Sequence, residues 1–462
     1  MSASRLSDPV HFSSVGAMAR AIARREVSAV ELTEAHLTRL QQLRSLNALV
    51  QSNPEGSLEQ ARRADEQLAG GEPVGPLHGV PVTIKDSIET ADFVTTGGTY
   101  GLRGRTPAED ATVVRRLRRA GAIVLGKTNT PELTLSFETA NEIYGMTYNP
   151  YDLSRSPGGS SGGAAALIAA GGSPFDVGSD YGGSIRLPAH FCGIAGLKPT
   201  SGRVPRSGHV YPFGGVNDSF QQLGPMARNV EDLTLTLPLL AGPDHVDPAI
   251  VPLPLGDPAD VGIDALRIGF FTSTETAPVE EPVQAAVRAA VRTLESAGAT
   301  VEEIPTPWFE EAFDVGVGLF RADGGAAVER LLLSMGTTES DLLGTTNGGL
   351  TAHELDALVA RWFAVRSNVA RALETFDVIV SPPNARSAPK SGWALSPLTL
   401  PAFSYTILHN VTGWPSGVVR CGSDGAMPVG VQVTAKPAEE HVVLAALGHL
   451  EDELGGYLPP DL

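Results

Sequence analysis

Two glycine-flanked serine segments are the part of the sequence best suited to chemistry. The first reads SPGGSSGG at 156–163, and the second reads GSDYGGSIRLPAHFCGIAGLKPT at 178–200. Glycine has no Cβ, so a glycine-rich backbone can take positive φ angles, approach a ligand closely and direct several N–H groups at one spot. Donors grouped in this way can bind the oxyanion of an acyl-transfer reaction. The pattern therefore predicts a loop-built site with Ser160 and Ser184 as candidate nucleophiles.

Other motifs built on glycine fit these segments poorly. A phosphate-binding P-loop needs a lysine directly after the glycines, which 158–163 lacks. Residues 159–163 match the G-x-S-x-G elbow of α/β-hydrolases, but an elbow follows a strand and the preceding polar run contains two prolines. A flexible connector is the remaining alternative. The apolar run at 164–170 argues against it, because the glycines then enter a buried helix whose N-terminus favours negative charge.

A serine nucleophile needs a base, and a lysine is the candidate because no Ser–His–Asp spacing stands out. Lys85 directly follows GVPVTI at 79–84, which is predicted to be a short buried strand. Burial disfavours the ammonium and lowers the pKa of a lysine, so that the neutral amine can accept a proton. A solvent-exposed ammonium at the end of a strand is the other interpretation. The residues alone leave both open.

Metal and thiol chemistry are not expected. The ten histidines include no HExxH motif, and the two cysteines, Cys192 and Cys421, match no zinc-ligand spacing. His190 and Cys192 lie two apart on an apolar stretch, which is more typical of core residues than of a Cys–His pair. We therefore expect neither a metal nor a cofactor.

Composition indicates a cytoplasmic protein that does not bind nucleic acid or anionic membranes. The formal net charge is −18, which repels nucleic acid and anionic membrane surfaces. The N-terminus lacks the apolar region of a signal peptide, no run is long enough to span a membrane, and two cysteines cannot form a disulfide framework. The only dense basic cluster, four arginines within 115–119, is interpreted as a solvated helix face.

Helices and strands alternate along the chain, which predicts an α/β fold. Ser28 and Glu31 form a capping box that opens an N-terminal helix, and a helix at 110–120 precedes a strand at 122–126. The alternation returns in the second half, with strands at 266–271, 299–304, 376–383 and 428–435 and helices at 280–297 and 439–453. Strands on both sides of the proline-rich stretch 246–260 are expected to join one sheet.

Four segments together resemble the amidase signature family: GVPVTIKD (79–86), GKTNTPEL (126–133), SRSPGGSSGG (154–163) and the segment 178–200. The resemblance covers most of the chain from about 28 to 453, through 223–233 and, more loosely, 409–417 and 428–433. It implies an α/β fold with a central mixed β-sheet flanked by helices on both faces. The implied single domain spans 1–462, with N-terminal helices at 1–70, a core carrying the reactive residues at 71–240, and the C-terminal part of the same sheet with pocket segments at 241–462.

The resemblance also ranks the candidate residues. It implies that Ser184 is the nucleophile, that Ser160 is a bridging serine at a cis peptide, and that Lys85 is the base. The N–H groups expected to hold the oxyanion are those of Tyr181, Gly182, Gly183 and Ser184 itself. Ser161, Asp180 and Arg186 are expected to support the loop. Family members often carry threonine where this chain has Tyr181, so the phenol ring is expected to affect substrate choice and not catalysis.

The implied activity is hydrolysis of a C–N bond in a small molecule, an amide, anilide or carbamate, through an acyl-enzyme. One alternative is the glutaminase subunit of a tRNA-dependent amidotransferase, although the match to that branch weakens at 130–133 and 217–225. A urethanase or an esterase with the same triad is another, and a homodimer is possible. Pocket walls are expected from the aromatic residues Tyr144, Phe191, Trp308, Phe320, Trp362 and Trp393, each of which is also typical of a core.

Overall fold

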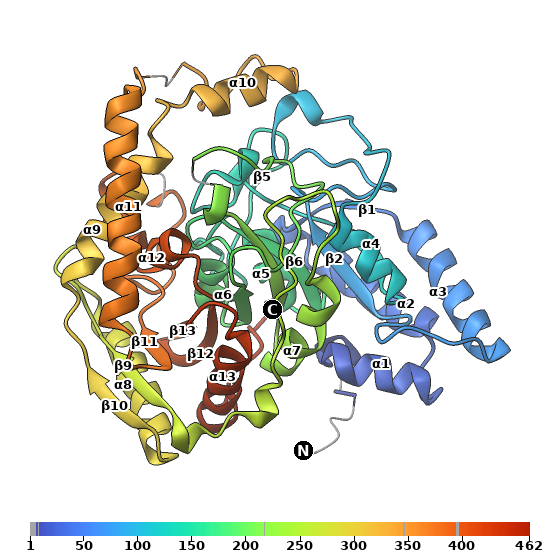
Figure 1. Cartoon of the computed structure of the whole chain (residues 1–462). Coiled ribbons are helices and arrows are strands. Elements are labelled where there is room, and N and C mark those ends of the chain that lie inside the picture. Colours follow the sequence, from blue (N-terminus) through green and yellow to red (C-terminus); the bar gives the residue numbers. More distant parts are fainter. Residues whose placement is uncertain (1–5, 8, 217, 345–346, 394–396) are drawn as a thin grey trace.

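A central eight-stranded mixed sheet organises the protein (Figure 1). The computed structural model describes residues 6–7, 9–216, 218–344, 347–393 and 397–462, so Asn217 lies outside it. The strand order is β10-β9-β11-β13-β12-β7-β8-β6, parallel from β10 to β11 and antiparallel from β11 to β6. The strands are β6 (Phe175–Asp180), β7 (Ala195–Lys198), β8 (Gln222–Ala227), β9 (Arg267–Phe270), β10 (Thr300–Glu303), β11 (Val378–Ser381), β12 (Ser416–Asp424) and β13 (Met427–Ala435).

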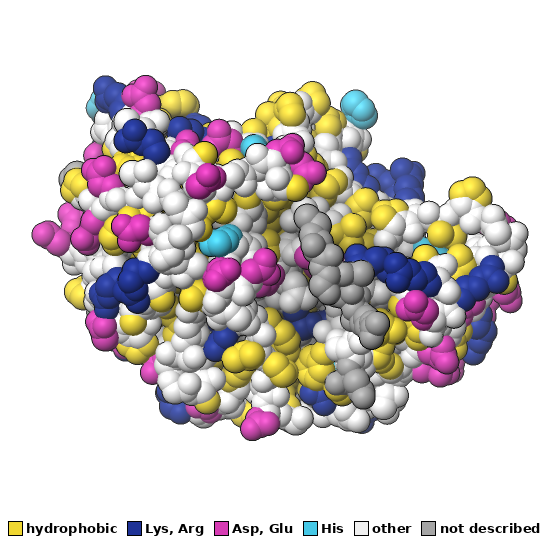
Figure 2. Space-filling model, turned by 90° about the horizontal axis from the view of Figure 1, so that it is seen from below, with side chains coloured by type: hydrophobic (Ala, Val, Ile, Leu, Met, Phe, Trp, Pro, Cys, Tyr) yellow, Lys and Arg dark blue, Asp and Glu magenta, His cyan; other side chains and the backbone are white. Residues whose placement is uncertain are grey.

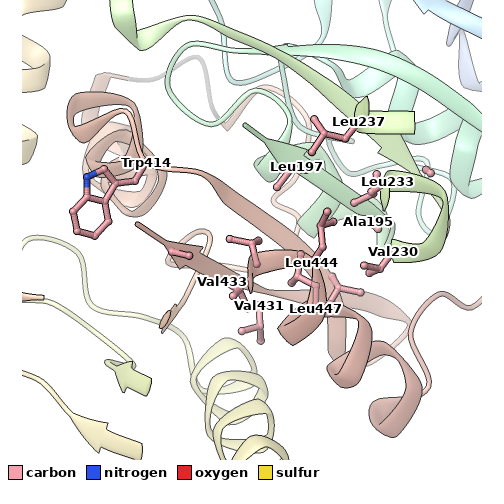
Figure 3. Close-up of a cluster of buried hydrophobic side chains, with 14 of the residues drawn as sticks. Ala195, Leu197, Val230, Leu233, Leu237, Trp414, Val431, Val433, Leu444 and Leu447 are labelled. Atoms are coloured by element: carbon pink, nitrogen blue, oxygen red, sulfur yellow. The ribbon is translucent and has the colours of Figure 1, made fainter. Parts of the chain in front are cut away.

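Helices cover both faces of this sheet, as the resemblance implied. On one face, α7 (Val230–Leu240) and α13 (Glu440–Leu454) bury leucines against β7 and β13, and α8 (Glu281–Ser296) packs alongside (Figure 3). On the other face, α5 (Gly162–Ala169) and α6 (Arg186–Cys192) form a separate apolar cluster with Met226 and Val418. Both layers consist of small and branched apolar side chains that the sheet and helices remove from water together.

A second, smaller sheet carries the strand that precedes Lys85. It has the order β1-β3-β2, with β1 (Leu49–Ser52), β2 (Pro81–Lys85) and β3 (Ile123–Thr128). The strands on either side of 246–260 do join one sheet, as predicted. Beyond that, the expectation of a single sheet is wrong: β2 forms no backbone ladder with the large sheet and meets β6 through side chains, where Thr83 Oγ1 donates to Asp176 Oδ2 at 2.7 Å. The short hairpin β4 (Ala140–Asn141) and β5 (Gly145–Met146) completes the strands described.

Helices expected from capping and periodicity are present at nearly the expected bounds. The capping box of Ser28 and Glu31 is confirmed at the start of α2 (Ala29–Gln42), which packs with α1 (Val15–Ala23) and α3 (Pro54–Gly70) in the N-terminal part. The helix at 110–120 is α4 (Thr112–Arg119). Its arginines are not simply solvated, which corrects the sequence interpretation. Arg116 is half-buried and donates to four backbone carbonyls from Leu240 to Pro243, where α7 ends.

A helical excursion from the C-terminal half crosses over the N-terminal half. It contains α9 (Pro307–Phe320), α10 (Ala326–Ser334), α11 (Ala352–Ala372) and α12 (Ser404–Thr412), and Figure 1 shows α10 reaching from the top of α11 toward the loops near residue 100. There, Thr337 Oγ1 lies 2.6 Å from Thr99 Oγ1, and Ser340 Oγ hydrogen-bonds Glu132. The excursion therefore ties the two halves together above the glycine-rich loops.

The charged side chains of the surface are mixed in sign. On the face seen from below, acidic and basic groups are interspersed among apolar ones, so the net charge of −18 is not gathered there in one patch (Figure 2). No helix among the described residues is long and apolar enough to cross a membrane.

Candidate active site

Lys85 is buried at the end of β2 and contacts three serine hydroxyls. Its Nζ lies 2.6 Å from Ser160 Oγ, 2.8 Å from Ser161 Oγ and 2.9 Å from Ser179 Oγ. The side chain is 0% exposed. The solvent-exposed interpretation of Lys85 is therefore wrong, and the structure brings the predicted base and the predicted bridging serine into direct contact.

Burial lowers the pKa of Lys85 well below its ordinary value, against the opposing charges of Asp176 and Asp180. Asp176 does not pair with the Lys85 amine. Its Oδ2 accepts from Thr83 Oγ1 at 2.7 Å and from Thr128 Oγ1 at 3.0 Å, and burial raises its own pKa to about 6. The amine is thus held among neutral hydroxyls. In its neutral form it has a lone pair that can accept the Ser160 proton.

Ser160 lies in a loop whose glycines are required by close packing. A Cβ at Gly159 would lie 2.5 Å from the backbone N of Glu138, and one at Gly163 would lie 2.4 Å from the backbone N of Asn129. The Gly159–Ser160 peptide is cis, which confirms the expectation from the resemblance. The helix α5 begins directly after this loop, at Gly162. The flexible-connector alternative is therefore wrong, because the loop is buried and closely packed.

Ser184 lies between β6 and α6, two residues before α6 begins at Arg186. It is 4% exposed, and its carbonyl accepts from the Ser161 N–H at 3.1 Å, which joins the two serine segments. Gly183, one residue earlier, has a φ of +127°, and a Cβ there would lie 2.3 Å from Thr406 Oγ1. Only glycine fits this position without displacing α12. The two candidate serines therefore belong to one connected backbone unit.

One predicted oxyanion donor already has an acceptor. The Gly183 N–H donates to Asp180 Oδ1 at 2.8 Å, so in this structure it holds the turn together. Thr406 Oγ1 donates to the Gly182 carbonyl at 2.6 Å and fixes the orientation of the peptide that follows Gly182. The roles predicted for the Tyr181 and Gly182 N–H groups stay predictions.

Asp180 and Arg186 form a buried ion pair that connects four elements. Arg186 donates to both oxygens of Asp180 at 2.9–3.0 Å, to Asn410 Oδ1 at 2.7 Å and to Gln432 Oε1 at 2.9 Å. Burial would raise the pKa of Asp180, but the charge and hydrogen bonds of Arg186 and the amide of Asn410 hold it below its ordinary value. The pair links β6, α6, α12 and β13 behind Ser184.

Several residues of the site were not identified from the sequence. Ser179 lies within the segment 178–200 but was not among the candidate residues. Thr406, Asn410 and Gln432 come from helix and strand segments more than 200 residues away. The looser family-like segments 409–417 and 428–433 contained Asn410 and Gln432 and were the available signal.

The expected aromatic wall residues fall into two groups. Phe191, Trp308 and Trp362 are at most 9% exposed and belong to apolar cores. Phe320 and Trp393 are half-buried and pack against aromatic rings beside the site, Tyr181 and Phe403 respectively. Tyr144 is half-buried, and its hydroxyl accepts from Gln51 Nε2 at 3.1 Å. Among the described residues, no group of three or more His, Cys, Asp or Glu could hold a metal ion.

A mixed sheet with helices on both faces and a buried Lys–Ser contact beside a glycine-rich loop fit the class of hydrolase that the sequence resembles, and comparison with known proteins identifies the family. The family model for Amidase matches residues 31–444. The chain belongs to the amidase signature family, whose members include enzymes acting on C–N bonds.

Its sequence relatives include the A subunit of glutamyl-tRNA(Gln) amidotransferase from two bacteria. The protein of Chloroflexus aggregans is 37% identical over 472 residues, which cover 94% of this chain and 95% of the relative. The protein of Heliobacterium modesticaldum is 35% identical, and the match covers 96% of this chain and 97% of the relative. Both matches run nearly the full length of each protein.

Solved structures of similar fold include two hydrolases and an amidotransferase subunit. Fatty acid amide hydrolase has a TM-score of 0.86 at 25% identity, covering 98% of this chain and 87% of that one. The 6-aminohexanoate cyclic dimer hydrolase has a TM-score of 0.86 at 27% identity, covering 98% and 99%. The corresponding amidotransferase protein from Thermotoga maritima has a TM-score of 0.81 at 25% identity, with 99% of each chain covered.

Replacing Lys85 by methionine should abolish turnover and change how stability depends on pH. Burial lowers the pKa of Lys85 in the folded protein below that in the unfolded chain. Between these two pKa values the unfolded chain binds the proton and the folded protein does not, so burial of Lys85 lowers the free energy of unfolding progressively as pH falls below 10.5. The Tm advantage of Lys85→Met over wild type should therefore be larger at pH 6 than at pH 10. Calorimetry at both pH values measures it. An advantage that does not depend on pH would contradict the lowered pKa.

The pH–rate profile of the wild type should rise through a pKa well below the ordinary 10.5 of lysine, because the neutral amine is the reactive form. The measurement is kcat/KM between pH 5 and 10 with an uncharged substrate. A rise that appears only near pH 10.5 would contradict a base prepared by burial.

Gly183→Ala should lower kcat/KM by about 10²–10³, the effect of losing one oxyanion donor, because its Cβ would meet Thr406 and move the Tyr181–Ser184 backbone. Gly70→Ala is the matched control, since nothing lies within 4 Å of the added Cβ. Turnover of the two variants under identical conditions is the measurement. Equal activities would show that the turn tolerates displacement.

Asp180→Asn should lower the free energy of unfolding by about 3–5 kcal/mol, because it leaves the Arg186 charge buried without a counter-charge. The exposed pair of Glu59 with Arg63 provides the control, and Glu59→Gln should change stability by less than about 1 kcal/mol. Urea unfolding followed by circular dichroism compares them. Similar losses of unfolding free energy in the two variants would contradict the expectation that breaking the buried pair costs more than breaking an exposed one.

Proposed function

We propose that this chain hydrolyses amide C–N bonds through an acyl-enzyme formed on Ser184, with Ser160 and Lys85 relaying the proton. The observation that carries the proposal is the 2.6 Å contact between Lys85 Nζ and Ser160 Oγ, at a lysine whose pKa burial lowers. A buried, uncharged amine beside a hydroxyl is a proton acceptor at neutral pH.

In the proposed acylation step, Ser184 is the nucleophile, and Ser160 and Lys85 carry its proton to the leaving group. Ser184 Oγ attacks the substrate carbonyl carbon and loses its proton to Ser160 Oγ, whose own proton passes to Lys85 Nζ. The oxyanion that forms is held by backbone N–H groups of the Tyr181–Ser184 turn. When the C–N bond breaks, Ser160 gives its proton to the leaving nitrogen and regains one from Lys85. The products are an ester on Ser184 and a free amine.

Water reverses the relay in the second step. It loses a proton through Ser160 to Lys85 as its oxygen attacks the ester carbonyl, and the C–O bond to Ser184 then breaks. Ser184 regains its proton, and the acid leaves. Lys85 ends in its original neutral form, so the cycle consumes one water and requires no cofactor.

The sequence comparisons favour glutamine as the substrate. The relatives at 35–37% identity are named as the A subunit of glutamyl-tRNA(Gln) amidotransferase, and this name favours the reading of the chain as a glutaminase subunit over that of a stand-alone amidase. In that case the chain would act with partner subunits, and ammonia would be the leaving group.

The side chains beside the nucleophile favour a second candidate, a stand-alone hydrolase of uncharged amides. A Cβ added to Gly182 would lie 3.6 Å from Phe137 and 3.7 Å from Ile407. Apolar side chains therefore surround Gly182, which lies two residues before Ser184. Phe137 in turn stacks on Phe403. A free amino acid carries an ammonium and a carboxylate, and both need polar partners when they leave water.

A substrate panel with an active-site label tests the function. Wild type should be labelled once by a fluorophosphonate at Ser184, identified by mass spectrometry, and should turn over at least one of glutamine, an aliphatic amide, an anilide, a carbamate or an ester. Ser184→Ala should lose labelling and at least about 10⁴-fold in turnover while keeping its circular dichroism spectrum. Activity retained in Ser184→Ala would overturn the nucleophile assignment.

The same panel separates the two candidates. Ammonia release from glutamine, strongest when the other chains of an amidotransferase are co-expressed and co-purify, would establish the glutaminase function. Turnover of an uncharged amide by the chain alone, with glutamine inert, would establish the stand-alone hydrolase.

A further inference from the structure

The backbone and the side chain of Tyr181 belong to two different features of the site. Its backbone is part of the Tyr181–Ser184 turn, and its half-buried ring lies among other aromatic rings. Phe320 of α9 meets the Tyr181 ring edge-on at 4.7 Å between centroids and 85° between planes. Tyr211 lies at 5.6 Å, also half-buried, and its side chain hydrogen-bonds that of Tyr181. The ring is therefore fixed by contacts from two distant segments.

Behind these rings the aromatic packing continues into the core. Phe220 lies 5.5 Å from Phe320 and 5.4 Å from Trp362, both edge-on, and it is fully buried. Trp362 Nε1 donates to the Val411 carbonyl of α12 at 2.8 Å. The buried rings support the exposed edges of Tyr181, Tyr211 and Phe320, so this wall does not depend on side chains that are free to rotate.

A second aromatic group lies against Gly182. Phe137 is half-buried and stacks on Phe403 with centroids 4.1 Å apart and planes 5° apart, and the half-buried Trp393 follows at 5.8 Å from Phe403. The rings on both sides of the Tyr181–Gly182 peptide carry no charge. Two charged groups near them, Asp323 and Arg386, are already engaged. Asp323 accepts from the Gly325 and Ala327 N–H groups at the start of α10, and Arg386 lies over Trp393 and pairs with Glu280.

We infer that the Tyr181 ring, with Phe320 and Phe137, selects substrates that carry an uncharged aromatic group next to the scissile bond. The inference rests on the proposed acyl-enzyme at Ser184 and specifies the substrate class as aryl amides. Partly exposed rings beside a nucleophile offer edge-to-face and offset-stacked contacts, which a saturated ring of similar size cannot make. In this proposal Tyr181 is a specificity-determining residue, because its half-buried ring belongs to the turn that carries Ser184.

The test compares aryl amides with their saturated counterparts. Acetanilide is paired with N-cyclohexylacetamide, and benzamide with cyclohexanecarboxamide, so that the ring is on either side of the scissile bond. The quantity measured is the ratio of kcat/KM for the aryl to the cyclohexyl member of each pair. Comparing this ratio between variant and wild type cancels the intrinsic reactivity of the substrates.

Tyr181→Leu removes the ring but keeps an apolar side chain, and it should lower the ratio about three- to tenfold in at least one pair, mainly through KM. Tyr181→Phe keeps the ring and should retain the wild-type ratio. Phe363→Leu is the control, because Phe363 is 58% exposed on α11, and it should leave both ratios unchanged. An unchanged ratio in Tyr181→Leu, or an equal fall in Tyr181→Phe, would overturn the role of the ring.

Protection from labelling provides a measurement that does not need turnover. Phenylboronic acid should slow fluorophosphonate labelling of Ser184 at lower concentration than cyclohexylboronic acid, and Tyr181→Leu should reduce this difference by the same three- to tenfold. If glutamine is hydrolysed and the four amides are not, the aromatic preference falls while the acyl-enzyme stands. If Ser184 is neither labelled nor needed for any turnover, the proposed function itself falls.

Discussion

The burial of one amine among three hydroxyls is the constraint on which the rest of the site depends. Lys85 Nζ reaches Ser160, Ser161 and Ser179 within 2.9 Å, and no carboxylate is among these partners. Such burial is unfavourable for a charged lysine, so the surrounding structure must stabilise it. It does so by packing the small sheet that carries Lys85 against β6 of the large sheet. The glycines of the Ser160 loop then allow the two backbones to approach closely.

The Asp180–Arg186 pair places Ser184 relative to that amine. A buried ion pair adds little net stability compared with apolar packing, but losing one partner strongly destabilises the fold. The pair therefore specifies one arrangement of these elements more than it stabilises the fold. Asp180 also accepts from the Gly183 and Ile185 N–H groups on either side of Ser184. Its carboxylate therefore sets the conformation of the turn, while Arg186 connects the turn to α12 and β13. The turn that carries Ser184 is therefore held by β6 and α6 from the N-terminal half of the chain and by α12 and β13 from the C-terminal half.

Much of the site could be predicted because Ser160 and Ser184 lie in short glycine-rich segments. Close contacts there exclude a Cβ at several positions, so the glycines mark the site in the sequence. Lys85 needed the resemblance, since a lysine at a strand end is compatible with both burial and exposure. The division into two sheets could not be predicted, because β2 and β6 meet through side chains such as Thr83 and Asp176 and not through backbone pairing. Arg116 was misjudged for a similar reason: its acceptors are backbone carbonyls at the end of α7, which no sequence pattern marks.

In the proposed mechanism, the Tyr181–Ser184 turn uses its backbone for the reaction and the Tyr181 side chain for substrate choice. A backbone N–H does not depend on side-chain type, so position 181 can change its side chain without removing a donor, whereas Gly183 cannot accept a Cβ beside Thr406. In the proposed site, the side chain can therefore vary at position 181, where it would face the substrate, but not at Gly183, where it would face α12. The tyrosine contributes a ring held by Phe320 and Tyr211, both from segments outside the catalytic loops. In the proposed mechanism, substrate choice can thus change without a change in the proton relay. Full-length similarity to the A subunit of an amidotransferase does not by itself determine which amide is cleaved.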